Sequence, residues 1–261
     1  MAKTLLTVNG AYRNVKDGFI TVDGVYRRVK AAYMTVNGVY RPCWSSYDPV
    51  FANNTWEQIA EACSTRQVPD TWVVGDQKTM TIDSTSYSVA IIGKSHDYYS
   101  DESGKAPLTF QLVGAYQSTG QMNGHNTNTG GWENCKMRSE KLPTILSHLP
   151  TEVQNSIKEI KKRTGTASGT TTVVSNDKLF LLSEKEVFNT TNQSVDNEGT
   201  QYEYYKTAKN RIKTCDGSTQ RWWLRSPRKS SSAEFCYVTP EGLLAYSIAD
   251  NPWYISFAFC F

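Results

Sequence analysis

Three copies of one short pattern, T-V-[ND]-G-[AV]-Y-R, occur at the start of the chain and begin at Thr7, Thr21 and Thr35. In each copy, β-branched and aromatic residues flank an Asn-Gly or Asp-Gly pair, which accepts the positive φ angles of a type I′ turn. Residues 1–44 therefore predict three 14-residue β-hairpin repeats. Because so small an array buries little apolar surface, we expect it to pack against other copies or other chains, as an attachment or oligomerisation module. The alternative is an extension that folds against the rest of its own chain.

The rest of the chain, residues 45–261, begins with a helical pattern. A capping-box spacing at residues 54–57 precedes apolar residues at positions i, i+3, i+4 and i+7, which are Trp56, Ile59, Ala60 and Cys63. This predicts a short amphipathic helix that residues 68–70 bring to an end. Strands are then expected at residues 72–76, 79–82, 86–92 and 109–113.

The second half of the chain alternates irregular and regular patterns. Residues 116–134 are rich in Gly, Asn and Thr and predict a long irregular loop, which is usually functional or held in place by the surrounding structure. The other expected segments are a helix at 135–148 broken near Pro143, a helix from Thr151 with Gln154 completing its capping box, a polar loop at 164–172, a buried strand at 179–182, a helix from Ser183 and a β-rich end at 221–261. Helices among irregular strands, without regular βαβ alternation, indicate the α+β class.

Composition and charge exclude several classes of protein. The 261 residues are 39% hydrophobic, enough for one large domain or two smaller ones. The 28 Lys and Arg against 25 Asp and Glu leave a net charge of +3, too little for a dedicated nucleic-acid binder or a polybasic membrane anchor. No apolar run reaches the roughly 18 residues of a membrane span. The first residues leave no room for a secretory signal peptide, so we expect synthesis in the cytoplasm without an export signal.

Residues that could carry chemistry are few. The six cysteines form no Cys-x-x-Cys pair and the chain has three histidines, so we expect buried thiols rather than a zinc site. The loop at His96 and Asp97 is rich in carboxylates and could hold Ca²⁺, but a solvated or hydrogen-bonded loop is favoured. A Cys/His nucleophile stays open as an alternative, although Cys236 and Cys260 lie in apolar strands that favour core packing. We therefore expect no catalytic residue, no metal, no cofactor and no enzymatic activity.

Aromatic residues make up 12% of the chain, and several lie in an irregular mixture with turn formers at residues 228–256. The core candidates flank or punctuate this segment and are Trp222, Trp223, Phe235, Cys236, Phe259, Cys260 and Phe261. Large apolar side chains that are exposed together would form an adhesive patch. The predicted ligand-binding residues are Arg228, Lys229, Ser231, Ala233, Tyr237, Thr239, Leu243, Leu244, Tyr246, Ile248, Asp250, Trp253, Tyr254 and Ser256. The alternative is an ordinary β-rich core of alternating strands.

A set of short motifs over residues 50–261 resembles a known family. The motifs are the string at 221–227 (RWWLRSP), the terminal Phe-Cys-Phe at 259–261, and those at 72–76, 96–97, 122–123, 130–132, 137–139, 179–184 and 198–202. They resemble phage and prophage tail-associated variable proteins of diversity-generating retroelements, whose domain is related to the C-type lectin and formylglycine-generating-enzyme folds. The 14-residue repeats are similar to short β-repeats that precede such domains in phage tail proteins.

This resemblance implies a C-type-lectin-like domain over 45–261, preceded by the hairpin module, in the tail of a virion. It implies a receptor- or ligand-binding protein in which reverse transcription rewrites codons of segment 228–256. The implied partners are a host-surface receptor, other tail proteins contacted through the repeats, and further copies of the chain, plausibly in a trimer. Two alternatives remain: an enzyme of the formylglycine-generating type, which needs a reactive cysteine pair, and a structural tail protein that binds no ligand.

Overall fold

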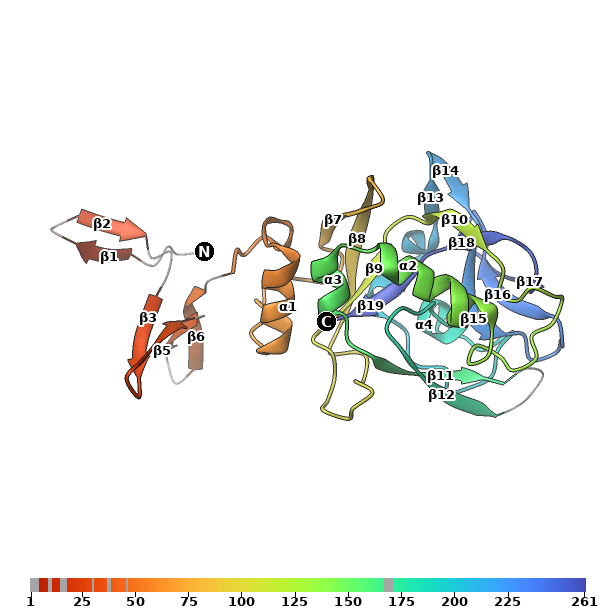
Figure 1. The fold of residues 1–261 in the computed structure, drawn as a ribbon, viewed down its shortest axis with the longest axis horizontal. Helices are drawn as coiled ribbons and strands as arrows, with labels where there is room; N and C mark the ends of the chain where they lie inside the picture. The colour runs from red at the N-terminus through yellow and green to blue at the C-terminus, as the bar shows by residue number, and fades with distance from the viewer. Residues whose placement is uncertain are drawn as a thin grey trace.

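The computed structural model describes residues 5–8, 11–14, 18–29, 31–36, 39–45, 47–166 and 171–261. Strands predominate in it and the helices are short, which confirms the α+β class (Figure 1).

The first six strands form three separate hairpins. They are β1 (Leu5–Val8) with β2 (Ala11–Asn14), β3 (Gly18–Val22) with β4 (Val25–Val29), and β5 (Ala31–Val36) with β6 (Val39–Ser45). All three share one register, in which the Thr of each repeat lies opposite its Tyr. In the middle hairpin Asp23 and Gly24 have φ angles of 51° and 76°, as a type I′ turn requires. The predicted hairpins are therefore confirmed; the other two Asn-Gly turns lie outside the described residues.

The first helix of the main body is confirmed, with shifted boundaries. After a 3-10 turn, η1 (Phe51–Asn53), α1 runs over Trp56–Ser64. The prediction placed the capping box one residue too early, because Thr55 is the N-cap and exchanges hydrogen bonds with Gln58. The helix ends at Ser64, before residues 68–70, where its end was expected. Its buried alanine is Ala62, whereas the predicted apolar face contained Ala60.

A four-stranded sheet comes next, in the order β19-β9-β8-β7. Its strands are β7 (Gln77–Ile82), β8 (Thr85–Lys94), β9 (Leu108–Leu112) and β19 (Ala258–Cys260), which confirms the strands expected at 79–82, 86–92 and 109–113. The strand predicted at 72–76 is wrong. Asp76 N–H closes a turn on Val73 C=O at 3.1 Å, and Gly75 has a φ of +100°, which an extended strand does not adopt.

A five-stranded sheet carries the C-terminal part, in the order β10-β18-β15-β16-β17. Its members are β10 (Tyr116–Gly120), β15 (Trp222–Pro227), β16 (Glu234–Val238), β17 (Leu244–Ile248) and β18 (Trp253–Ile255). The β-rich end is confirmed. The loop expected over 116–134 is wrong for its first five residues, which form β10.

Short elements lie in the chain between β10 and β15 of this sheet. They are η2 (Met137–Lys141, a π-helical turn), α2 (Leu142–His148), α3 (Thr151–Ser156), β11 (Ile160–Gly165), β12 (Thr172–Asp177), α4 (Glu184–Phe188), η3 (Glu203–Lys206), η4 (Ala208–Arg211), β13 (Lys213–Cys215) and β14 (Ser218–Gln220). The polar loop expected at 164–172 includes the last two residues of β11 and the first residue of β12. Residues 167–170 between these strands lie outside the described residues.

Three expectations for this region need correction. Pro143 does not break the helix, because it lies in the first turn of α2, where its missing N–H costs nothing. Gln154 forms no capping box, and its amide instead donates to the carbonyls of Ser147 and Leu149. Residues 179–182 are buried as expected, but they pair with β19 only through a bridge from Phe180 to Ala258, so they form no continuous strand.

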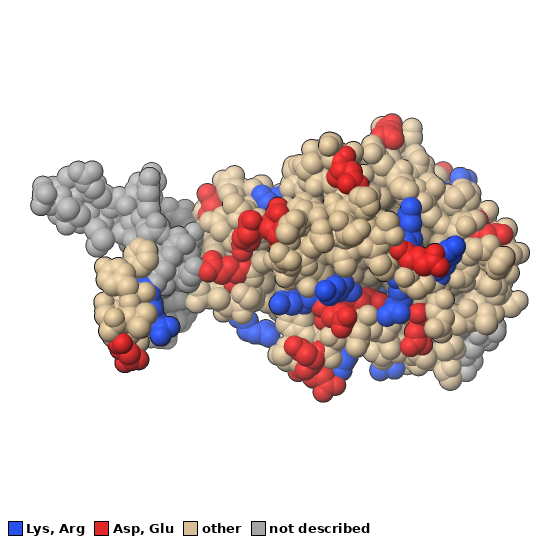
Figure 2. Space-filling model, in the orientation of Figure 1, with Lys and Arg blue, Asp and Glu red and all other residues tan. Residues whose placement is uncertain are grey.

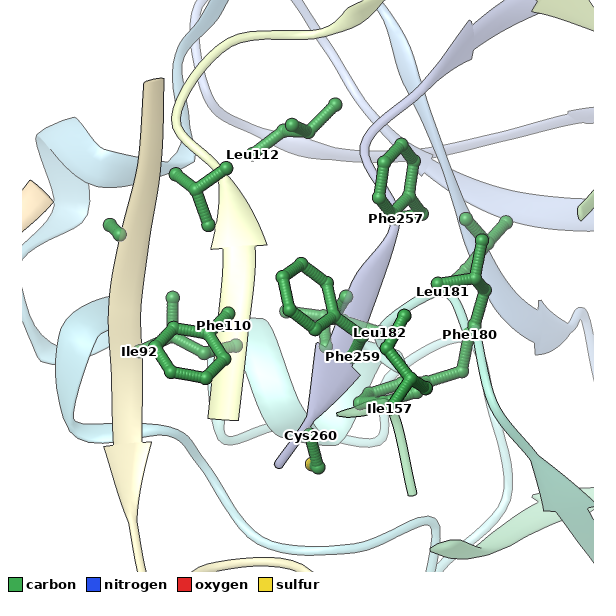
Figure 3. Packing of buried hydrophobic residues seen from close by; sticks show 14 of the residues in the cluster. Ile92, Phe110, Leu112, Ile157, Phe180, Leu181, Leu182, Phe257, Phe259 and Cys260 are labelled. Atoms are coloured by element: carbon green, nitrogen blue, oxygen red, sulfur yellow. The ribbon is translucent and has the colours of Figure 1, made fainter. Parts of the chain in front are cut away.

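The C-terminal strand β19 lies in the middle of the core. Its side chains pack between β9 and the segment at 180–182 (Figure 3). Phe259 stacks near Phe110 and Phe261, with ring centroids 5.2 and 5.6 Å away. The seven predicted core residues around the C-terminal segment are all buried, with at most 2% exposure, which confirms that part of the prediction.

Candidate functional site

Strand pairing divides the predicted binding residues between the two faces of the five-stranded sheet. Tyr246 lies opposite Cys236 and Leu244 opposite Val238, so these side chains share a face, whereas Tyr237 belongs to the other. Trp222 lies opposite Val238 on one side and opposite Tyr254, in a parallel pair, on the other. Tyr254 therefore shares the face of Val238 and Leu244. We call Leu244, Tyr246 and Ile248 on this face, together with Leu243 directly before β17, the β17 patch.

The β17 patch is apolar and exposed. Leu243, Tyr246 and Ile248 leave 63%, 42% and 37% of their surface in solvent, and β17 is the end strand of its sheet. The guanidinium of Arg228 lies 3.4 Å from the ring centroid of Tyr246 and forms an ion pair with Glu234 at 2.6 Å. The ring of Tyr246 is therefore held in a fixed position although it faces water.

The opposite face carries a half-buried aromatic row. Trp223 contacts Tyr237, and Tyr237 contacts Trp253, with ring centroids 6.2 and 6.1 Å apart. Arg221 covers the ring of Trp253 at 5.0 Å. Tyr237 and Trp253 thus belong partly to the core and expose less surface than the β17 patch.

Most of the other predicted residues are accessible. Lys229 is exposed, and those that are partly exposed are Arg228, Ser231, Ala233, Thr239, Asp250 and Tyr254. Ser256 is fully buried, and its hydroxyl donates to Leu112 C=O at 3.2 Å, so its assignment to the binding surface is wrong. The residue follows β18 directly, where the chain turns into the core.

The long loop at 121–134 is hydrogen-bonded to the C-terminal segment. The buried side-chain amide of Asn128 donates to the carbonyls of Ser231 and Glu234 at 2.8 and 2.9 Å. Gln121 donates to Asp250 C=O, and Asn123 N–H donates to Ala249 C=O. Gly131 has a φ of +58°, and a Cβ there would lie 2.6 Å from Gly165 C=O, so this position requires glycine. The loop is therefore a structural support for residues 231–250.

A buried cluster of charges fixes β15, on which the C-terminal segment begins. Arg225 donates to both carboxylate oxygens of Glu186, at 2.5 and 3.0 Å. The ammonium of Lys162 bridges Glu186 at 3.0 Å and Asp97 at 2.5 Å. All four side chains are buried and come from β15, α4, β11 and the loop after β8. We call Asp97, Lys162, Glu186 and Arg225 the charge cluster.

Local sequence places Glu186 in this cluster. The helix expected from Ser183 is α4, with Ser183 as its N-cap, and Glu186 Oε2 accepts from Ser183 N–H at 3.0 Å in a capping box. The same carboxylate binds Arg225, so the helix start and the β15 strand depend on one side chain. Ser226 extends the contact, because its hydroxyl accepts from Glu184 N–H and donates to Glu198.

Burial and neighbouring charges act in opposite directions on these carboxylates. Burial alone would raise the pKa of Asp97, but the ammonium of Lys162 and the neighbouring His96 hold that pKa well below its usual range. Burial likewise opposes ionisation of Glu186, and Arg225 and Lys162 outweigh it, so its pKa is lowered. Burial dominates at Glu198 and raises its pKa to about 7, against the hydrogen bond from Ser226.

Asp97 therefore belongs to an ion-pair network rather than to a loop of carboxylates that face solvent. It also accepts hydrogen bonds from Tyr202 and Thr109, at 2.9 and 2.6 Å to Oδ2. Within the described parts of the chain, no group of His, Cys, Asp and Glu side chains could hold a metal ion.

The described cysteines are all buried and unpaired: Cys63, Cys135, Cys215, Cys236 and Cys260. Burial raises the pKa of Cys63 and of Cys135 to about 12 and that of Cys236 and Cys260 well above the ordinary value. These thiols therefore stay protonated at neutral pH, and a protonated thiol is a weak nucleophile. The side chain of Cys43 lies outside the described residues.

Sequence reasoning missed the charge cluster as a unit. Its members are separated by up to 128 positions in the chain, from Asp97 to Arg225. The available signal was partial, because His96-Asp97, Ser183 and the Arg225-Ser226 pair occur in the quoted motifs, whereas Lys162 and Glu186 occur in none of them. These three motifs therefore contribute residues to the scaffold that carries the C-terminal segment.

Comparison with known proteins gives one family. A family model described as a domain of unknown function, DUF6273, matches residues 97–255. No curated protein and no solved structure matches the chain. The matched range begins at Asp97 of the charge cluster and ends with the last residue of β18, so it contains the whole cluster and the β17 patch. Among the described helices, none has the length and apolar character to cross a membrane.

Proposed function

Given that the chain belongs to the DUF6273 family, we propose that it is a ligand-binding protein without enzymatic activity, and that the β17 patch is its contact surface. One observation carries this proposal: Tyr246 and Ile248 face solvent on an end strand that has no charged residue or proline, and a third exposed apolar residue, Leu243, directly precedes that strand. Native proteins usually protect such an edge with charges, proline or a covering segment. An unprotected apolar edge is typical of a surface that a partner covers.

The charge cluster supports the proposal that the scaffold and the contact surface of this domain are separate sets of residues. Buried ion pairs and the loop at 121–134 hold β15 and the segment 231–250 in place, while Leu243, Tyr246 and Ile248 leave more than a third of their surface in solvent. Side chains of the patch can therefore change without unfolding the scaffold. This is the property that a surface diversified by a retroelement needs, and the proposal includes that history for residues 228–256 and a C-type-lectin-like fold for 45–261.

The proposed setting is the tail of a virion, with a host-surface receptor as ligand. The hairpin repeats would then attach the chain to other tail proteins or to further copies of itself. In the middle hairpin Phe19, Ile20 and Tyr26 are 51%, 54% and 75% exposed, and an isolated two-stranded hairpin is marginally stable in water. Apolar contacts with a partner would stabilise it. On the face shown in Figure 2, acidic and basic side chains are interspersed, so this face produces no long-range field of one sign.

Combined replacement of Leu243, Tyr246 and Ile248 by serine should abolish adsorption of virions that carry the variant to their host cells. Surface substitutions of this kind change stability by about 0.5 kcal/mol or less each, so the purified variant should unfold near the wild-type temperature. The matched control replaces three other exposed apolar residues, Val50, Val73 and Ile212, by serine, and should adsorb normally. Normal adsorption by the patch variant would instead support a structural tail protein.

The rival enzyme of the formylglycine-generating type needs reactive thiols, and their burial opposes it. In a Cys43→Ser background, folded protein at pH 8 should leave its five remaining cysteines unlabelled by a thiol-specific dye over minutes, and denaturant should expose all five. Rapid labelling of two cysteines in the folded protein would favour the enzyme.

The diversification claim has its own test in the flanking DNA. A reverse-transcriptase gene beside a near-copy of the sequence that encodes 228–256, differing at adenines, would support it. Absence of that pair would reduce the proposal to a tail-associated ligand-binding domain.

A further inference from the structure

A cavity of about 710 Å³ opens above the charge cluster, away from the β17 patch. This lies within the roughly 300–1,000 Å³ of ordinary small-molecule sites. Loop 96–105, strand β11 and the segment at 197–200 supply most of its wall, and no residue of 228–256 lines it. The cavity is therefore separate from the surface proposed for the receptor.

At the base of this cavity, the donors of the charge cluster are already used in hydrogen bonds within the protein. The ammonium of Lys162 contacts Asp97, Glu186 and the hydroxyl of Tyr202, and Arg225 is fully engaged with Glu186 and carbonyl oxygens. These groups are buried and satisfied, so they form a rigid base and have no free donors for a ligand.

The rim of the cavity, by contrast, carries two cations that pair with no carboxylate of the described residues. Five cations and three carboxylates line the cavity, which leaves a net charge of +2 with His96 neutral. Lys161 is paired with Glu102 at 2.5 Å, but no carboxylate of the described residues lies within ion-pair distance of Lys105 or Arg163. Arg163 is exposed and contributes one 3.3 Å hydrogen bond, to the hydroxyl of Thr172.

The wall beside Lys105 is aromatic and held in place. Tyr98 is 58% exposed, and the ammonium of Lys105 lies 4.8 Å from its ring centroid. Arg66 donates to the carbonyls of Ser103 and Lys105. These bonds fix the loop that carries Tyr98 and Lys105. An aromatic ring next to a cation that has no carboxylate partner suits a molecule with an anionic group on a ring-shaped body.

We infer that this cavity binds a small organic anion, a phosphate or carboxylate on a ring-shaped body such as a sugar, through Arg163 and Lys105 at the rim and the face of Tyr98. The inference does not rest on the proposed function, because the two sites share no residue. Glu102 competes with the anion for Lys161.

Calorimetric titration of the full chain at constant ionic strength tests this inference. The probes are glucose 6-phosphate, inorganic phosphate, D-glucuronate and neutral D-glucose. We expect saturable binding of glucose 6-phosphate or of glucuronate, which separates phosphate from carboxylate, and none of glucose. Weaker binding of inorganic phosphate than of glucose 6-phosphate would show that the ring body contributes.

The variants are chosen from exposed or partly exposed residues, so the fold should persist, which circular dichroism checks. Arg163→Gln and Lys105→Gln should each weaken the affinity about tenfold, the effect of one charged hydrogen bond. Glu102→Gln should strengthen it, because Lys161 is released. Lys206→Gln, an exposed cation outside the cavity, should leave it unchanged. No saturable binding of any anion, or an equal loss in Lys206→Gln, would overturn the inference and would leave the proposal for the β17 patch intact.

Discussion

Replacement of Arg225 by methionine should lower the free energy of unfolding by about 3–5 kcal/mol, because it leaves the buried carboxylate of Glu186 without its main partner. The loss also removes the donors that bind the carbonyls of Leu181 and Glu198. Methionine keeps much of the volume, so the effect is electrostatic rather than a cavity effect. Urea denaturation at pH 7, followed by tryptophan fluorescence, measures it.

The control for this substitution is Arg163→Met, which removes an exposed guanidinium from the neighbouring strand β11. Its cost should be about 0.5 kcal/mol or less, the usual range for a surface position. If both variants lost the same small amount, the charge cluster would not be the scaffold that we describe. The position of the β17 patch would then need another explanation.

Phe259→Ala should cost about 3–5 kcal/mol, as large-to-small changes of buried aromatic residues do. The ring is fully buried and contacts Trp56, Phe110 and Phe261, so alanine leaves a cavity lined by aromatic rings that cannot close it. Thermal or urea unfolding measures the loss.

Leu243→Ala is the matched substitution outside the core. It truncates a smaller apolar side chain to the same methyl group at a residue that is 63% exposed, and it should change stability by about 0.5 kcal/mol or less. A large loss for Leu243→Ala would mean that the β17 patch is part of the core, and this would contradict the proposed contact surface.

Elements that depend on neighbours in sequence could be predicted. The three hairpins follow from Asn-Gly and Asp-Gly turns between β-branched residues, and α1 and α4 follow from their caps and apolar spacing. The errors arose where two local patterns compete. Asn54 and Thr55 can both cap a helix, and the side chain of Asn54 instead bonds to Asp48 and Val50 of the preceding turn.

Tertiary contacts override local propensity in other places. Residues 72–76 look like a strand, but Gly75 adopts a positive φ and Trp72 is buried in the core, so the chain turns there. Gln154 has the spacing of a capping box, but the carbonyls of Ser147 and Leu149 lie close enough to take its amide. A sequence window around either site contains no information about these partners.

The sequence by itself determined the repeat module, the α+β class and the buried residues on either side of the C-terminal segment, because turn chemistry and apolar patterning act over short distances. Only the tertiary structure decided which predicted binding residues reach solvent. Strand pairing places Tyr246 and Tyr237 on opposite faces, and the turn into the core buries Ser256. It also decided that Asp97, Lys162, Glu186 and Arg225 meet, since buried charges are stable only beside partners that the fold brings from distant parts of the chain.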